Sequence, residues 1–127
     1  MNYAETINIG DLLTRLKFPG VVHVGVVVGV NLVCHNTPER GEHISTLSEF
    51  AAGQTNVGVR RTNADPSSVI SRANQLLANP KRYDPVNRNC EHTAFEIVYG
   101  AAKSPAVLTI VCLFLVGAVL LLLLRQR

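Results

Sequence analysis

The chain has 127 residues, a formal net charge of +3 at pH 7 and 47% hydrophobic residues. Two of its arginines, Arg125 and Arg127, follow an apolar C-terminal run, so the preceding part has a charge near +1. Aromatic residues make up 6% of the chain and are not interleaved with basic ones. This composition allows one small folded domain and argues against a nucleic-acid-binding protein, which normally carries a strong basic excess.

The N-terminal third is predicted to form strands. Residues 10–18 indicate a strand with loose alternation, in which Leu12, Leu16 and Phe18 share one face. A Pro-Gly turn signal follows. Residues 21–28 are rich in valine, which predicts a strand buried on both faces.

The valine-rich strand contains one strongly polar side chain, His23, and is predicted to form a hairpin with residues 32–35. With the turn centred on Gly29, His23 lies opposite His35 and the two side chains share a face, about 4.5–5.5 Å apart at Cβ. A register shifted by one residue would separate them. Cys34 alternates with His35 and is expected in the core.

A polar, turn-rich segment follows the hairpin, and we expect His43 in this segment to be solvated. Residues 45–50 carry a short helical pattern with Ser45 and Glu49 as candidate capping residues. Residues 56–61 indicate another strand, because apolar and polar positions alternate.

Two helices are predicted after the strands. Asp65 is a good N-cap for a helix that continues to about Asn79. Asn89 is a good N-cap for a helix that begins at Cys90 and stops at Gly100. Because strands come first and helices later, the expected class is α+β, an antiparallel sheet with helices packed on it.

A cysteine in the first turn of a helix is a candidate nucleophile, because free backbone N–H groups and the helix dipole favour the thiolate of Cys90. Such chemistry also needs an imidazole and a third group that orients it. His23 is the candidate base and His35 the candidate orienting group. The alternatives are a small buried helix residue for Cys90, a satisfied core residue for His23 and a surface residue for His35. His92 points about 200° away from Cys90 and is expected to order the local loop.

Other chemistry has little support. There is no close Cys/His pairing of the spacing typical of a metal site and no glycine-rich phosphate loop. With two cysteines before the apolar run and no secretory signal pattern, we expect a reduced cytosolic domain with free thiols, although a disulfide between Cys34 and Cys90 remains open.

Residues 105–124 carry no charge and predict a helix of about 30 Å, the thickness of a bilayer core. Lys103 precedes this run and Arg125 follows it, where basic residues meet lipid headgroups. We therefore expect a folded domain over residues 1–104 and a single transmembrane anchor over 105–124. Because three residues follow the anchor, we expect a tail-anchored protein whose domain faces the cytosol.

These features together resemble the lecithin:retinol acyltransferase family, most closely its HRAS-like suppressor branch of phospholipase A/acyltransferases. The resemblance extends over about residues 9–124. It rests on Asn89-Cys90-Glu91-His92, on the strand His23-Val24-Gly25-Val26-Val27-Val28-Gly29, on a second histidine at His35, and on the opening Gly10-Asp11-Leu12-Leu13.

The resemblance implies a circularly permuted papain-like fold of the NlpC/P60 type with Cys90 as nucleophile, His23 as base and His35 as orienting group. The cysteine would attack a glycerophospholipid ester and hold the acyl group as a thioester. Water, an amine or a lysophospholipid would then accept it, and no metal or organic cofactor would be required. The expected partners are membrane phospholipid and the bilayer; other protein partners are left open.

Two departures from the family pattern leave a second function open. Thr93 stands where the family usually has an aromatic residue, which is expected to loosen packing behind the nucleophile. The chain is also shorter than the cellular acyltransferases, which is expected to reduce the acyl-binding surface. Some picornaviruses carry short H-box/NC proteins of the same pattern, regarded as host-factor-binding proteins without established enzymatic activity. The alternative is therefore a non-enzymatic, membrane-tethered interaction protein; an imidazole of His23 close to the thiol of Cys90 would favour the enzyme.

Overall fold

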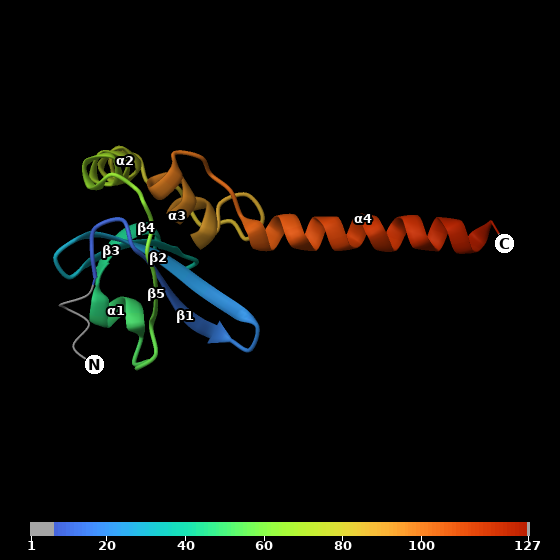
Figure 1. Ribbon diagram of the computed structural model, residues 1–127, viewed down its shortest axis with the longest axis horizontal. Coiled ribbons are helices and arrows are strands. Elements are labelled where there is room, and N and C mark those ends of the chain that lie inside the picture. Colours follow the sequence, from blue (N-terminus) through green and yellow to red (C-terminus); the bar gives the residue numbers. More distant parts are fainter. Residues whose placement is uncertain (1–6, 127) are drawn as a thin grey trace.

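The computed structural model of the protein describes residues 7–126. Five antiparallel strands form one sheet in the order β4-β3-β2-β1-β5, and their bounds are β1 Leu12–Phe18, β2 Val21–Gly29, β3 Leu32–Thr37, β4 Gly41–Thr46 and β5 Gly58–Arg60. The four helices are α1 Leu47–Ala51, α2 Pro66–Ala78, α3 Cys90–Tyr99 and α4 Pro105–Arg125. The α+β class is confirmed. Figure 1 shows α2 and α3 on one side of the sheet, α1 on the other, and α4 projecting away from both.

The sheet has a separate apolar cluster on each face, because successive strand residues point to opposite sides. The first cluster joins Leu12, Val24, Val26 and Cys34 to side chains of α2 and α3, among them Val69, Ala73, Ala94 and Ile97. The second joins Leu13, Val27 and Val33 to Phe50 of α1 and to Val57. Cys34 therefore lies in the core, as predicted.

The register of the β2–β3 hairpin differs from the predicted one. His35 lies opposite Gly25, not opposite His23. The turn consists of Val30 and Asn31, with Asn31 in the left-handed region at φ 55°, and the pairing shifts between Val27 and Gly29. The offset from the predicted pairing is two residues, so alternation is preserved and His23 and His35 still share a face.

The outer half of the β1–β2 hairpin is less buried than predicted. Leu12 and Leu13 are both buried, whereas Leu16 and Phe18 are exposed. The predicted shared face of Leu12, Leu16 and Phe18 holds for Leu12 and Leu16 and is interrupted before Phe18, where the pairing shifts. Leu16 and Phe18 are exposed because this end of the hairpin runs out beyond the core. The first two residues of β2 are exposed for the same reason.

Strand β4 was not predicted, because its sequence is mostly polar. It pairs with β3 along its whole length and places His43 directly opposite His35, so that His43 is half-buried and not solvated. The cap of α1 is Thr46, which forms a capping box with Glu49, and Ser45 belongs to the strand. The polar side chains of Glu42 and Ser45 can be buried in β4 because each has a hydrogen-bond partner elsewhere in the fold.

Helices α2 and α3 begin directly after the capping residues predicted from the sequence. Asp65 caps α2, and its side chain accepts from the Ser68 N–H. Asn89 caps α3, which ends with Gly100 in the left-handed region at φ 77°. Helix α4 has Ser104 as its N-cap and no buried residue, and its 21 residues are long and apolar enough to cross a membrane.

Candidate active site

Two buried histidines form the centre of the site. Nε2 of His23 lies 2.8 Å from Nδ1 of His35, and Nε2 of His35 lies 2.8 Å from Oγ of Ser45. With a proton on each Nε2, His23 donates to His35, and His35 donates to Ser45. This pair of tautomers leaves Nδ1 of His23 as a proton acceptor. The predicted His23–His35 pair is therefore formed, and Ser45 extends it by one residue.

A phenylalanine from α1 holds the two imidazoles in place. The Phe50 ring stacks on His23 with centroids 5.4 Å apart and meets His35 edge-on at 5.3 Å. Gly25 leaves room for this ring, since an added Cβ would lie 2.7 Å from both Phe50 Cε2 and Val33 Cγ1. The fourth ring of the group is that of His43, whose centroid is 4.2 Å from that of His35.

Burial keeps both paired histidines neutral at pH 7. It is the main reason that the pKa of His23 is lowered to about 3, and the neighbouring His35 adds to the effect. The pKa of His35 is also lowered to about 3, by burial first and then by His43. A neutral imidazole is the form that accepts a proton from a thiol. A thiolate formed beside it would offset the desolvation that disfavours the imidazolium.

Cys90 occupies the first turn of α3, and the residues around it order that turn. The Asn89 side chain accepts hydrogen bonds from the backbone N–H groups of Glu91 and His92. In return, Nδ1 of His92 accepts from the Asn89 N–H at 3.1 Å. The prediction that His92 orders the local loop is confirmed.

The thiol is protonated at rest, contrary to the expectation from helix position. Burial raises the pKa of Cys90 above its usual value, and the carboxylate of Glu91 acts in the same direction. The Val24 backbone N–H and the charge of Lys17 oppose this rise without cancelling it. Desolvation of the thiolate therefore outweighs the backbone hydrogen bonds and the positive charge that favour it, and catalysis at Cys90 would need a base.

The thiol approaches β2 from one face of the sheet and the histidines occupy the other. Cys90 packs against the cluster that contains Val24, and the Val24 backbone N–H faces the thiol. His23, the preceding residue, packs against Phe50 on the opposite face. Within residues 7–126 the hydrogen bonds of the paired imidazoles run to each other and to Ser45. The structure thus brings Cys90 to the residue next to His23, and direct contact of the thiol with Nδ1 is an expectation for the reacting state.

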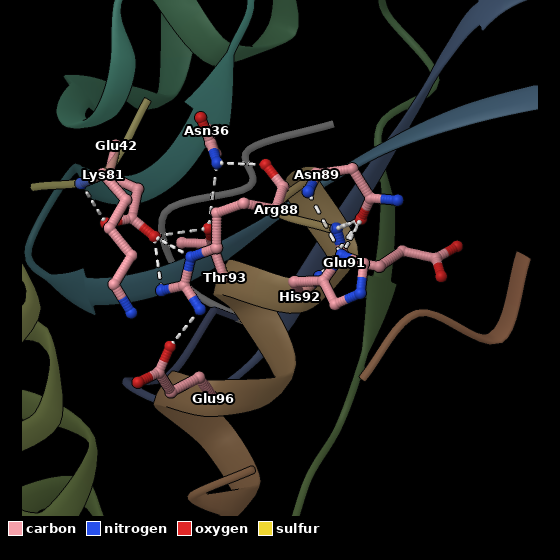
Figure 2. Close-up of polar contacts among 9 residues, drawn as sticks. All are labelled: Asn36, Glu42, Lys81, Arg88, Asn89, Glu91, His92, Thr93 and Glu96. Carbon is pink, nitrogen blue, oxygen red and sulfur yellow. Dashed lines mark hydrogen bonds and ion pairs between the residues drawn. The ribbon is translucent and has the colours of Figure 1, made fainter. Parts of the chain in front are cut away.

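A buried carboxylate joins the cysteine helix to β4, the strand that pairs with β3 (Figure 2). Glu42 of β4 accepts hydrogen bonds from Arg88 Nε at 2.6 Å, from Thr93 Oγ1 at 2.8 Å and from the Lys81 N–H at 2.8 Å. Arg88 also forms ion pairs with Glu42 and with Glu96 of α3. Both oxygens of Glu42 are thus used, as a buried carboxylate requires.

Thr93 is part of this network and does not loosen the packing. Its side chain is fully buried, donates to Glu42 and accepts from Asn36 Nδ2 at 3.2 Å. Asn36 also donates to the backbone carbonyl of Arg88 at 2.9 Å. The expectation of loose packing behind the nucleophile is therefore wrong, because polar bonds to β3 and β4 replace the contact of an aromatic ring. The sequence signal for this network was a threonine at a helix position that faces the sheet.

Two comparisons with known proteins bear on these residues. The family model for lecithin retinol acyltransferase matches residues 42–103, which run from β4 to the segment before α4 and include Cys90. His23 and His35 precede the matched segment. No curated protein matches the chain. The match supports the assignment of the chain to a lecithin retinol acyltransferase-like family.

Proposed function

We propose that the protein is a membrane-anchored thiol phospholipase A/acyltransferase that acts on glycerophospholipid esters through a cysteinyl thioester, as in the HRAS-like suppressor branch. The observation that carries the proposal is the buried, neutral chain His23–His35–Ser45 beside the residue that faces Cys90. Family membership supports acyl transfer in general. The phospholipid substrate is inferred from the apolar helix α4.

In the proposed reaction the Cys90 proton moves to Nδ1 of His23 while sulfur attacks the ester carbonyl. His35 holds the His23 ring in the required tautomer, and Ser45 does the same for His35. The ester bond between the acyl carbon and the glycerol oxygen then breaks, and the leaving lysophospholipid oxygen takes the proton back from His23. In the second half, water, an amine or a lysophospholipid gives a proton to His23 and attacks the thioester carbonyl. The carbon–sulfur bond then breaks, the acyl group leaves on the acceptor, and His23 returns the proton to sulfur, which restores the Cys90 thiol. The protein residues alone supply these steps.

Helix α4 suits this chemistry, because it removes the entropy of finding a substrate that lies in the bilayer. We propose that α4 spans the membrane as a C-terminal anchor and that the folded part lies on the cytosolic side. Lys103 at one end of the helix and Arg125 at the other support the placement of its ends among lipid headgroups.

The second candidate is a non-enzymatic interaction protein of the H-box/NC type, tethered to membranes and directed to a protein partner. One observation favours it: the partly buried thiol is protonated, and it lies on the opposite face of the sheet from the imidazoles. In this interpretation the polar network around Glu42 serves only to stabilise the fold.

Thioester trapping separates the two functions. The full chain, inserted in vesicles, is incubated with phosphatidylcholine that carries a labelled acyl group. We expect a covalent label that hydroxylamine removes and that is absent from Cys90→Ala. Cys112→Ala is the matched control, because Cys112 is an exposed free thiol of α4 and should leave labelling unchanged. If wild type and Cys90→Ala bind the same amount of label, the enzyme proposal is wrong and the interaction protein is favoured.

A further inference from the structure

The outer end of the β1–β2 hairpin carries a group of exposed apolar side chains that the proposed reaction does not explain. Leu16 is 51% exposed and lies opposite Val22, which is 44% exposed. Phe18 is 57% exposed and lies opposite Val21, which is 37% exposed. We call these four residues the hairpin tip. Val21 and Val22 are consecutive strand residues and the pairing shifts between the two pairs, so the four side chains cover both surfaces of the hairpin end. Exposed apolar groups of this kind commonly mark an interaction site.

The hairpin tip lies on the side of the domain from which α4 leaves. Figure 1 shows the β1–β2 hairpin extending towards the end of the domain where α4 begins. A contact ties the hairpin to the segment before α3, since Lys17 Nζ lies 5.6 Å from the centre of the Tyr83 ring. That segment also exposes Val86. Lys17 is also close enough to Cys90 for its positive charge to act to lower the pKa of the thiol.

Hydrogen bonds hold the start of α4 to the two residues that flank Cys90. Oε2 of Glu91 accepts from Ser104 Oγ at 2.9 Å and from the Ala106 N–H at 3.1 Å. Nδ2 of Asn89 donates to Ser104 Oγ at 3.0 Å. Because Ser104 is the N-cap of α4, the direction of this helix is set relative to the cysteine helix. A bilayer crossed by α4 would therefore face one defined side of the domain.

We propose that the hairpin tip enters the headgroup–acyl boundary of the same bilayer that α4 crosses, as a second membrane contact that holds Cys90 at the depth of the lipid ester bonds. This inference rests on the proposed anchoring. The occupant is a lipid surface and not a protein, because the hairpin tip extends to the side of the domain from which an exposed apolar helix departs. Basic residues accompany both contacts, Lys17 in the hairpin and Lys103 before α4, and would lie among anionic headgroups.

The absence of tryptophan from the chain allows a direct test. Phe18→Trp places a single tryptophan in the hairpin tip, and Val30→Trp places one in the β2–β3 turn, where Val30 is 96% exposed. Each full-length variant is reconstituted in vesicles of phosphatidylcholine and phosphatidylserine, some containing spin-labelled lipid. We expect emission from Phe18→Trp to be blue-shifted and quenched by the lipid label, and emission from Val30→Trp to be neither.

The same samples separate this proposal from the others. If the chain floats with vesicles but the two tryptophans respond alike, the hairpin contact is wrong and the anchor stands. If the chain does not float with vesicles, both are wrong. In the Phe18→Trp background Cys90→Ala should abolish thioester labelling and leave the quenching unchanged, so failure of the enzyme proposal is seen independently.

A second variant tests what the contact does for the reaction. Leu16→Ser combined with Phe18→Ser should lower the labelling rate on vesicle phosphatidylcholine about tenfold. Labelling by a short-chain phospholipid in free solution should be unchanged, because the residues at Cys90 and His23 are intact. An equal loss on both substrates would overturn the inference, since it would mean that the hairpin supports the fold or the site and not the bilayer contact.

Discussion

Mild acid should destabilise the fold because His23 and His35 are buried as neutral rings. Burial lowers the pKa of each to about 3, whereas an unfolded histidine titrates near 6.5. As the pH falls through 6.5, the unfolded chain therefore takes up protons before the folded one. The stability from this difference is fully present above pH 6.5, and it is lost progressively down to about pH 3.

The size of the effect follows from the two pKa values. One pH unit within this window is worth about 1.36 kcal/mol for one histidine. Between pH 6.5 and 5.0 each histidine should lower the unfolding free energy by about 1.6 kcal/mol, and the pair by about 3 kcal/mol. A typical unfolding free energy is about 5–15 kcal/mol. Hydrogen bonds lower the pKa of the exposed carboxyls Glu49, Asp65 and Asp84 from ordinary values of 3.8–4.5. Titration of these carboxyls therefore changes the unfolding free energy mainly below about pH 5.0.

Urea unfolding of the full chain in uncharged detergent micelles, followed by tyrosine near-ultraviolet circular dichroism, measures this loss. The matched control is the double variant His23→Gln/His35→Gln, which should retain little of the slope between pH 6.5 and 5.0. His92, whose pKa is lowered by partial burial, contributes equally to both proteins. An unfolding free energy that is flat with pH in wild type, or an equal slope in the double variant, would refute the burial of two neutral histidines.

Three further substitutions test the site. Glu42→Gln should lower the unfolding free energy by about 3–5 kcal/mol, because it removes the fully buried charge that pairs with Arg88; a loss below 1 kcal/mol in urea unfolding would contradict this role. Gly25→Ala should cost about 1–3 kcal/mol by overpacking against the neighbouring side chains, and an unchanged unfolding midpoint would show that the site can relax. Ser45→Ala removes the acceptor for His35 and should slow thioester labelling about tenfold with most of the stability retained, whereas Ser45→Thr should restore part of the rate; equal rates in all three proteins would exclude a positioning role.

Local physical chemistry was enough to predict the helices. Asp65 and Asn89 cap α2 and α3 because short polar side chains satisfy N–H groups within three residues in sequence. Helix α4 was predicted by a long run without charge. The sequence also placed His23 and His35 on one face, because alternation along a strand survives a register error of two residues.

The pairing of strands depended on distant residues and was decided by the tertiary structure. The actual β2–β3 register follows from a two-residue turn at Val30 and Asn31, a detail that the valine-rich sequence does not specify. Strand β4 buries Glu42 and Ser45, which are polar and do not signal a buried strand. Partners far along the chain make that burial possible, namely Arg88 for Glu42 and His35 for Ser45.

The protonation state of Cys90 was likewise decided by the tertiary structure. From sequence alone, Cys90 at a helix N-terminus has the position of a stabilised thiolate, and that position was predicted correctly. The protonation of the Cys90 thiol could not be predicted in this way, because the pKa of a thiol depends on how much water the packed sheet and helices exclude. The sequence thus determined which residues carry the candidate chemistry, the caps and the apolar helix. Only the packing decided that the thiol rests protonated, that Ser45 completes the histidine pair and that Thr93 joins the helix to the sheet.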